Sequence, residues 1–385
     1  MNRDSFLLSI AIPTKDRYET LIPIIDYFSS FNQDLVEIVI QDNSMNNSPV
    51  KKKLTNLSTH KNFKYYHSQE NLSVVENFDQ AILHCSGEFI CLIGDDDAVM
   101  PYIINIVKWM KNSRILSMNG YKPTYFWPNQ KTSYISSNVS GSLKFKNWDN
   151  KIVKLKIDTM LNNIISKGGT IMDNIPSVYH GIIHNSILKE IYSASGTHFP
   201  GPSPDMANAI ALTKFIDEHT FANLPIFISG KSIKSTGGQG IIHEHVASIE
   251  DVSHLPENTA SEWDPRIPKY WTGPTIWAET ILKVIEQLNL DHLKINFNFK
   301  YLYAYILIYH FKHRKIIFKN FKISLYDQLI CSYYVFVIFI NRSINFISNR
   351  NPLIVKKVTN VESMTKAIDH IMKIVKPNTL RNFDL

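Results

Sequence analysis

The chain has 385 residues, 44% hydrophobic and 19% charged, which is enough for one large domain with an appendage or for two modest domains. High apolar content combined with a modest net charge excludes a disordered chain. The net charge of +7 suits a phosphate-bearing ligand or an anionic membrane surface, but it is too small to indicate a nucleic-acid partner.

Cysteine usage and the N-terminus bear on the compartment. Cys85, Cys91 and Cys331 form no C-x-x-C pair, which predicts a reducing compartment and no zinc site. The first residues lack the charged and apolar regions of a secretory signal. No segment reaches about 18 uninterrupted apolar residues, so no membrane span is predicted. We therefore expect a cytoplasmic protein.

Short apolar runs alternate with segments of helical periodicity over residues 7–110. This alternation predicts an α/β fold in which a mostly parallel sheet is flanked by helices. The apolar runs are 7–13, 35–40, 62–67 and 89–93, and the helical segments are 18–31, 49–59, 74–85 and 103–110.

In such a sheet the ligand lies outside the carboxyl ends of the strands. The residues that follow the predicted strands at Thr14–Arg17, Asp42–Ser44 and Asp95–Asp97 are rich in carboxylates and hydroxyls. We therefore expect these three strand ends to converge on one site.

The later part of the chain is less regular. Residues 121–148 are rich in aromatic residues, Ser and Asn, and they predict a long loop or a hairpin. A strand-like run at 224–228 leads into a glycine-rich loop that ends at Gly240. We place the catalytic domain at 1–240 and a mainly helical C-terminal region at 241–385.

The acidic run Gly94-Asp95-Asp96-Asp97 directly follows an apolar strand. Adjacent carboxylates repel one another, and Mg²⁺ or Mn²⁺ would compensate them and bridge to a diphosphate. The alternative is a solvated turn that caps the next helix, because Asp favours helix N-termini. The buried strand before the run and the helix after it favour the metal site.

The first strand ends in Pro13-Thr14-Lys15-Asp16-Arg17 and has no G-x-G-x-x-G turn. This counts against a dinucleotide cofactor held by a glycine turn. Asp42 could accept hydrogen bonds from a base or ribose, or it could form an Asx-turn with Asn43 and Ser44.

Four segments together resemble family 2 glycosyltransferases in order and spacing: Ile10–Arg17, Ile38–Ser44, Asn71–Asn77 and Ser86–Asp97. The resemblance implies a GT-A (Rossmann-like) fold, inversion at the anomeric carbon, a divalent Mn²⁺ or Mg²⁺, and a nucleoside-diphosphate sugar donor, with a UDP-sugar favoured. It places Asp95 and Asp97 at the metal. It also implies a nucleotide-sugar site of Pro13, Thr14, Asp16, Arg17, Asp42, Asn71, Asn77, Asp95 and Asp96.

Two positions depart from that family's pattern. Gly94 stands where the family often has its first acid, and Glu76 stands where an Arg commonly precedes the Asn77 position. Which aspartate binds metal, and what contacts the donor phosphate, therefore stay open.

An inverting transfer needs a general base for the acceptor hydroxyl. The candidate is Asp205, which follows a Pro-Gly turn at the start of a predicted helix, 206–215. The alternative role of Asp205 is to cap that helix, and the two roles are compatible. Asp173 and Glu244 are the alternative bases.

Histidines supply a further candidate ligand. His243 and His245 flank Glu244 after the glycine-rich loop, and we name His245 as an additional metal ligand. We interpret His180 as a core or pocket residue.

The C-terminal stretch 301–347 combines an aromatic stripe with a basic cluster and a 12-residue apolar run, 329–340. As a helix this run is about 18 Å long, shorter than the hydrocarbon core of a membrane. It predicts either an interfacial patch on an anionic leaflet or an ordinary helical core or dimer interface.

The sequence thus predicts an inverting glycosyltransferase of bacterial surface polysaccharide synthesis. Its acceptor would be a saccharide or a lipid-linked saccharide at the inner face of the membrane, and no nucleic-acid partner is expected. The rivals are a nucleotidyltransferase, a non-catalytic nucleotide-sugar or polysaccharide-binding module, and a membrane-tethered scaffold.

Overall fold

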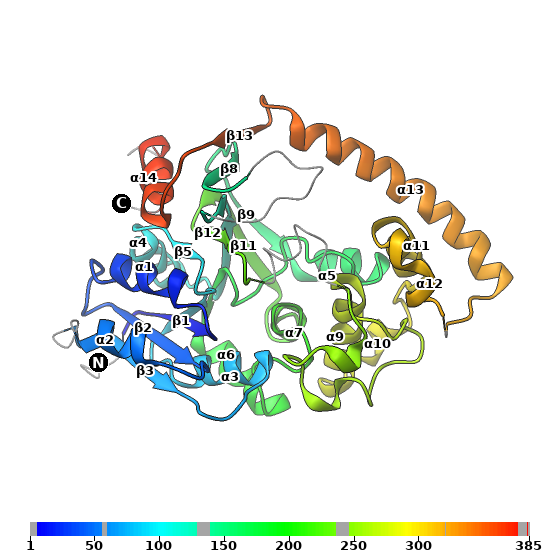
Figure 1. Ribbon diagram of the computed structural model, residues 1–385, viewed down its shortest axis with the longest axis horizontal. Helices are drawn as coiled ribbons and strands as arrows, with labels where there is room; N and C mark the ends of the chain where they lie inside the picture. The colour runs from blue at the N-terminus through cyan, green and yellow to red at the C-terminus, as the bar shows by residue number, and fades with distance from the viewer. Residues whose placement is uncertain are drawn as a thin grey trace.

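The computed structural model describes residues 6–55, 60–128, 139–235, 246–319, 321–375 and Phe383. The described chain forms an eight-stranded sheet and a five-stranded sheet, both flanked by helices (Figure 1). The predicted α/β fold with a helical C-terminal region is confirmed.

Four parallel strands form one half of the larger sheet, in the order β3-β2-β1-β4. Each of these strands and each of the four associated helices overlaps a segment predicted from the sequence. The strands are β1 (Leu8–Thr14), β2 (Val36–Asp42), β3 (Phe63–His67) and β4 (Phe89–Leu92). The helices are α1 (Tyr18–Phe28), α2 (Ser48–Thr55), α3 (Val74–Leu83) and α4 (Ile103–Asn112).

The other half of this sheet contains antiparallel pairs, so the sheet is mixed rather than purely parallel. β10 (Gly181–His184) lies antiparallel between β4 and β6 (Ser117–Tyr121). β11 (Glu218–Pro225) pairs parallel with β6 and antiparallel with β9 (Ile152–Lys156). β10 has four residues, and an apolar run this short gives no reliable strand signal.

The five-stranded sheet has the order β13-β8-β7-β12-β5. β7 (Thr124–Phe126) and β8 (Ser142–Lys146) pair antiparallel, so the aromatic-rich stretch forms a hairpin. β12 (Phe227–Lys231) pairs with β7 and with β5 (Ala98–Val99), the strand that directly follows the acidic run. β13 (Val355–Val358) pairs with β8.

Both faces of the parallel strands are buried. Along β4, Phe89 and Cys91 join a core with α1, α4 and α14 (Met364–Ile374), whereas Ile90 and Leu92 join the opposite core. The opposite core includes α5 (Ile157–Ser166), α6 (Asn185–Ser195), α7 (Pro204–Leu212) and α9 (Gly273–Gln287). This alternation explains why β4 reads as an uninterrupted apolar run.

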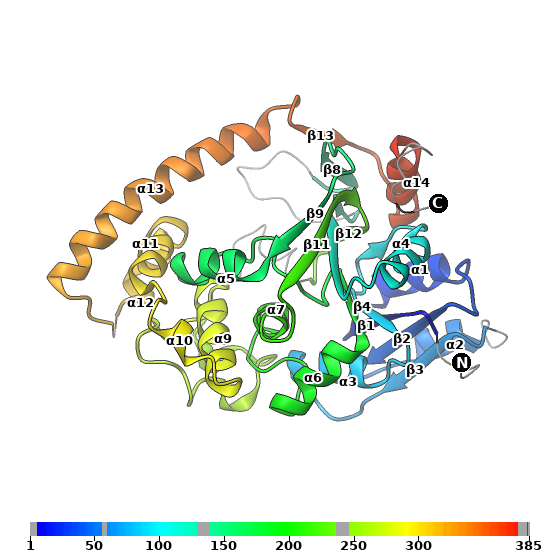
Figure 2. The same ribbon diagram turned by 180° about the vertical axis from the view of Figure 1, so that it is seen from behind.

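The C-terminal region contains α10 (Asp291–Lys294), α11 (Phe299–Tyr309), α12 (Arg314–Ile317) and α13 (Leu325–Arg350). α13 runs along the outer edge of the molecule from α12 to β13 (Figure 2). β13 and α14 then return to the N-terminal half, where α14 packs into the core of α1. The division at residue 240 stays a prediction.

Among the described residues, α13 is the one helix that is long and apolar enough to cross a membrane, judged by length and composition. Its 26 residues contain the predicted 12-residue run but extend well beyond it. The sequence expectation of no span rested on uninterrupted apolar runs, and scattered Asn, Ser and Arg residues interrupt this helix.

Glu279 in α9 yields a prediction about stability. Its side chain is buried, Oε2 accepts a hydrogen bond from the Asp264 backbone N–H at 2.9 Å, and Oε1 has no partner. Burial raises the pKa of this carboxyl from 4.5 to about 7. The folded state therefore binds a proton more tightly than the unfolded state, and stability falls as the pH rises through this range.

Glu279→Gln should remove this dependence. We expect the free energy of unfolding of the wild type, relative to the variant, to fall by about 3 kcal/mol between pH 4 and pH 8 in urea titrations. Glu286→Gln, at an exposed position of the same helix, is the control. Parallel pH curves for the wild type and Glu279→Gln would contradict the prediction.

Candidate functional site

The turn after β4 is held together by the Asp97 carboxylate. Its Oδ2 accepts hydrogen bonds from Gly94 N at 2.8 Å, Tyr179 Oη at 2.9 Å and His180 Nε2 at 2.7 Å. Its Oδ1 accepts from Gly230 N at 2.7 Å. Both oxygens are thus engaged inside the protein.

Electrostatics keep Asp97 ionised. Burial opposes the charged form, but the His180 ring and the two backbone amides outweigh it, so the pKa of Asp97 lies below its ordinary value. Burial lowers the pKa of His180, with Asp97 opposing, so the neutral ring donates its Nε2–H to the carboxylate. Asp97 as a metal ligand stays a prediction, and its hydrogen bonds favour a structural role.

Asp95 links the acidic run to the end of β1. Its Oδ2 accepts from Thr14 Oγ1 at 2.6 Å and pairs with Arg17 Nε at 3.0 Å, while its buried Oδ1 has no partner. Burial raises the pKa of Asp95 to about 7, Asp96 adds to this, and Arg17 opposes it. Asp95 therefore keeps one free oxygen in a site that disfavours its charge.

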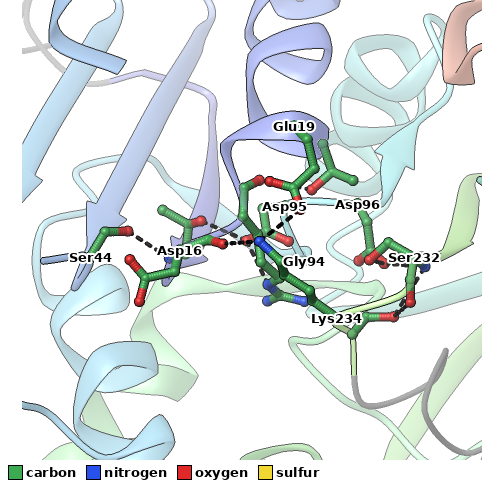
Figure 3. Close-up of polar contacts among 12 residues, drawn as sticks. Asp16, Glu19, Ser44, Gly94, Asp95, Asp96, Ser232 and Lys234 are labelled. Carbon is green, nitrogen blue, oxygen red and sulfur yellow. Dashed lines mark hydrogen bonds and ion pairs between the residues drawn. The ribbon is translucent and has the colours of Figure 1, made fainter. Parts of the chain in front are cut away.

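Asp96 points toward the segment after β12, where Ser232 donates from N at 3.0 Å and from Oγ at 2.7 Å to Asp96 Oδ2 (Figure 3). The Asp96 backbone oxygen accepts from Trp127 Nε1 at 2.9 Å. Burial and the neighbouring Asp97 raise the pKa of Asp96. The second oxygen, Oδ1, accepts no hydrogen bond from the described residues.

The ends of β1 and β2 lie beside these carboxylates. Asp16 adopts φ 54°, its N–H donates to Ser44 Oγ at 2.7 Å, and its carbonyl accepts from Lys234 Nζ at 3.0 Å. Pro13 is buried in β1. Asn77 in α3 donates from Nδ2 to Thr14 O at 3.3 Å and keeps a buried, unpartnered Oδ1. The three strand ends therefore converge as predicted.

Asp42 and Asn71 have partners of their own. Asp42 is buried, and its Oδ2 accepts from Tyr18 Oη at 2.6 Å and Tyr65 Oη at 2.8 Å. Its Oδ1 accepts from Ser44 N at 2.9 Å, the Asx-turn considered as the alternative. Asn71 Oδ1 accepts from Lys15 Nζ at 2.6 Å at the exposed rim. Nucleoside contacts from Asp42 and Asn71 stay predictions.

The two departures from the family pattern have local explanations. A Cβ at Gly94 would lie 2.9 Å from Asp97 Oδ2 and 3.2 Å from Tyr179 Oη, so the turn leaves no room for an acid. Glu76 accepts from Ser73 N at 2.7 Å and completes a capping box at the start of α3. Both residues serve the local fold.

Asp205 lies at the start of α7. Its Oδ1 accepts from Ser203 Oγ at 2.6 Å and from Met206 N at 2.8 Å, and its Oδ2 accepts no hydrogen bond from the described residues. Asn208 Oδ1 accepts from Val178 N at 2.9 Å, and Val178 O accepts from Leu92 N in β4. Asn208 thereby positions α7 relative to the acidic run.

The sequence analysis did not single out three lysines near the site, Lys122, Lys231 and Lys234. Lys234 pairs with Glu19 at 3.0 Å. Lys122 lies between β6 and β7 and is exposed. Its pKa is lowered by burial and by Lys231, and raised by Asp97 and Asp205. Lys122 therefore lies within electrostatic range of both the acidic run and Asp205.

The residues present fit a divalent cation with only two protein carboxylates. Among the described residues, Asp95 Oδ1 has no hydrogen-bond partner and no donor to Asp96 Oδ1 is found. The pKa of each carboxyl is raised, and a bound cation would lower it. The described residues hold no group of three or more His, Cys, Asp and Glu that could bind a metal. Mg²⁺ commonly takes one or two carboxylates and completes its shell with substrate phosphates and water.

Other candidates lie apart or cannot be placed. His243, Glu244 and His245 lie outside the described residues. Asp173 is exposed, with φ 51°, and accepts from Asn163 Nδ2 at 2.7 Å. Among the predicted bases in the described chain, Asp205 is therefore the one with evidence for a place near the acidic run.

Comparison with known proteins gives one family match, over the N-terminal part of the chain. The family described as glycosyl transferase family 2 matches residues 9–160. No curated protein matches the chain.

Solved structures with some likeness include S. aureus TarS 1–349. Its complex with UDP-GlcNAc has a TM-score of 0.43 and 12% identity, covering 85% of this chain and 79% of that one. Its complex with UDP has a TM-score of 0.43 and 11% identity, covering 83% and 76%. A third match, to S. aureus TarS, has a TM-score of 0.39 and 12% identity, covering 59% of this chain and 37% of that one. These likenesses are too distant to support conclusions about ligands.

Truncation of Asp97 should destabilise the protein more than truncation of Asp96. Asp97→Ala leaves four buried donors without their acceptor and should lower the free energy of unfolding by about 3 kcal/mol or more. Asp96→Ala removes a carboxylate whose charge is disfavoured, so stability should stay within about 1 kcal/mol of the wild type. Urea unfolding at pH 7.5 in EDTA measures both. Equal losses for the two variants would contradict these assigned roles.

Proposed function

We propose, from the match of residues 9–160 to glycosyl transferase family 2, that the chain transfers a sugar from a nucleoside-diphosphate sugar to an acceptor hydroxyl. The observation that carries the proposal is a pair of carboxylate oxygens at the carboxyl end of β4, Oδ1 of Asp95 and Oδ1 of Asp96, that accept no hydrogen bond from the described residues. A GT-A type site and a UDP-sugar donor are what the family resemblance implies.

The nucleotide would lie along the ends of β1 and β2, beside Thr14, Asp16 and Asn77. A divalent Mn²⁺ or Mg²⁺, held by Asp95 and Asp96, would neutralise charge on the leaving diphosphate. Arg17 holds Asp95 in place through its ion pair. Lys122 and Lys231 both lie within electrostatic range of His180 and would supply positive charge for an anionic group.

We assign the general base to Asp205. Its Oδ1 is fixed by Ser203 and by its own helix, which leaves Oδ2 to take the acceptor proton. The acceptor oxygen then bonds to the anomeric carbon as the bond to the diphosphate breaks. Attack from the face opposite the leaving group gives inversion.

For the acceptor we propose a saccharide or lipid-linked saccharide in bacterial surface polysaccharide synthesis. Support comes from the family resemblance and from the basic C-terminal region. Such an acceptor would place the protein in the cytoplasm, at the inner face of the cell membrane.

Donor binding can be tested by isothermal titration with UDP, GDP, dTDP and CMP, each with and without Mn²⁺. We expect one nucleoside diphosphate to bind in a metal-dependent way, because Asp95 and Asp96 alone do not complete a cation's shell. Asp96→Ala should abolish the metal dependence, and Asp34→Ala, at an exposed position, should retain it. No binding under any condition would overturn the proposal.

Asp205→Asn should separate binding from chemistry. We expect turnover to fall roughly a hundredfold to ten-thousandfold while the affinity for the nucleotide is unchanged. Ser203→Ala keeps the carboxylate and should have a much smaller effect on donor hydrolysis or transfer, followed as nucleotide release. Unchanged turnover in Asp205→Asn would exclude Asp205 as the base.

A further inference from the structure

The outward side of α13 presents a continuous apolar surface. Its inward side packs on α11 through Cys331 and Ile338. On the opposite side, residues spaced three or four apart share one helical face. This outer face of α13 consists of Tyr326, Leu329, Tyr333, Phe336, Ile340, Ile344 and Ile347, which are 41–74% exposed.

The outer face carries no charge. α13 has three charged residues, Asp327, Arg342 and Arg350. Asp327 pairs with Lys300 of α11 at 3.3 Å, and Arg342 donates to Ile308 O at 2.9 Å and lies over the Tyr309 ring. Two of the three charges are therefore turned toward α11, and the third lies at the helix end.

Positive charge is concentrated around this helix. Residues 292–361 contain eleven Lys and Arg and a single acidic residue, Asp327, so the segment carries +10. The whole chain carries +7, and the remainder is therefore −3. Exposed basic residues precede α13 at Lys312, Lys315, Lys319 and Lys322, and follow it at Arg350, Lys356 and Lys357.

This combination matches an anionic lipid surface better than a second copy of the chain. A paired helix would carry charged residues beside its apolar seam. Here the flanking positions include Val337, Phe339 and Phe346, which widen the apolar surface. Two copies would also bring two +10 segments together, whereas anionic headgroups complement them.

The contacts with α11 argue against a spanning orientation. The helix is about 39 Å long, enough to cross a bilayer. Crossing would pull it away from α11 and carry Arg342 toward the hydrocarbon, at a cost of several kcal/mol on insertion scales. A helix lying in the interface keeps these contacts and buries only the outer face.

We propose that the outer face of α13 docks in the plane of an anionic leaflet, with the basic residues at both ends contacting lipid headgroups. Docking rests on the proposed function, because it would bring the enzyme to a membrane-borne acceptor. Vesicle binding can nevertheless be measured without a sugar donor and without catalysis. Docking and sugar transfer can therefore fail independently.

The test is co-flotation of the full chain with vesicles of phosphatidylcholine alone or with 30 mol% phosphatidylglycerol, a composition chosen to be strongly anionic. We expect binding to the anionic vesicles that weakens at high salt. Tyr333→Glu with Phe336→Glu should reduce vesicle binding at least about tenfold. Two apolar contacts with the lipid are lost, and two negative charges are added that the anionic surface repels. Lys319→Gln should reduce it about fivefold.

The matched control is Asn345→Glu with Asn349→Glu, which adds the same charge to the same helix at exposed positions off the outer face. It should retain most of the binding, and nucleotide titration checks that each variant is folded. Three results would overturn the proposal: no vesicle binding, dimerisation of the wild type that Tyr333→Glu with Phe336→Glu abolishes, or resistance to extraction at pH 11, which indicates a spanning helix.

Discussion

The Asp97 carboxylate is the point where three distant segments of the chain meet. The turn after β4, the residues before β10 and strand β12 each place a buried donor on it. A buried charge of this kind persists only with such partners. Its presence also makes ionisation of Asp96 more costly. One carboxylate thus fixes the geometry of the turn and raises the pKa of its neighbours Asp95 and Asp96.

The parallel half of the fold was predictable because β1, β2 and β4 are buried on both faces and leave near-continuous apolar runs, interrupted by Ser9 in β1 and Glu37 in β2. The partners of the acidic run were not. His180, Gly230 and Ser232 lie 83, 133 and 136 residues from the aspartates that they contact. No local periodicity encodes such pairings, and β10, which carries His180 to the site, is too short to be recognised.

Local packing also accounts for residues that a motif comparison leaves unexplained. The Gly94 position is too tight for any side chain, and Glu76 is committed to the capping box of α3. Gly230 is equally constrained, since a Cβ there would meet the Asp96 carbonyl at 1.7 Å. The site therefore achieves its geometry by close backbone approach, and positive charge near it comes from Arg17, from Lys122 between β6 and β7, and from Lys231 in β12.

The overall charge of +7 conceals a division of the molecule into a slightly acidic body and a strongly basic C-terminal segment. Packing joins the two. α13 rests on α11, α11 on α9, and α9 on α7, where Thr280 Oγ1 accepts from Ser203 N at 3.0 Å, next to Asp205. If α13 lies on a leaflet, these packed helices hold Asp205 at a fixed height above it. A membrane-borne acceptor would then meet the base in a defined orientation, because close-packed helices do not deform freely.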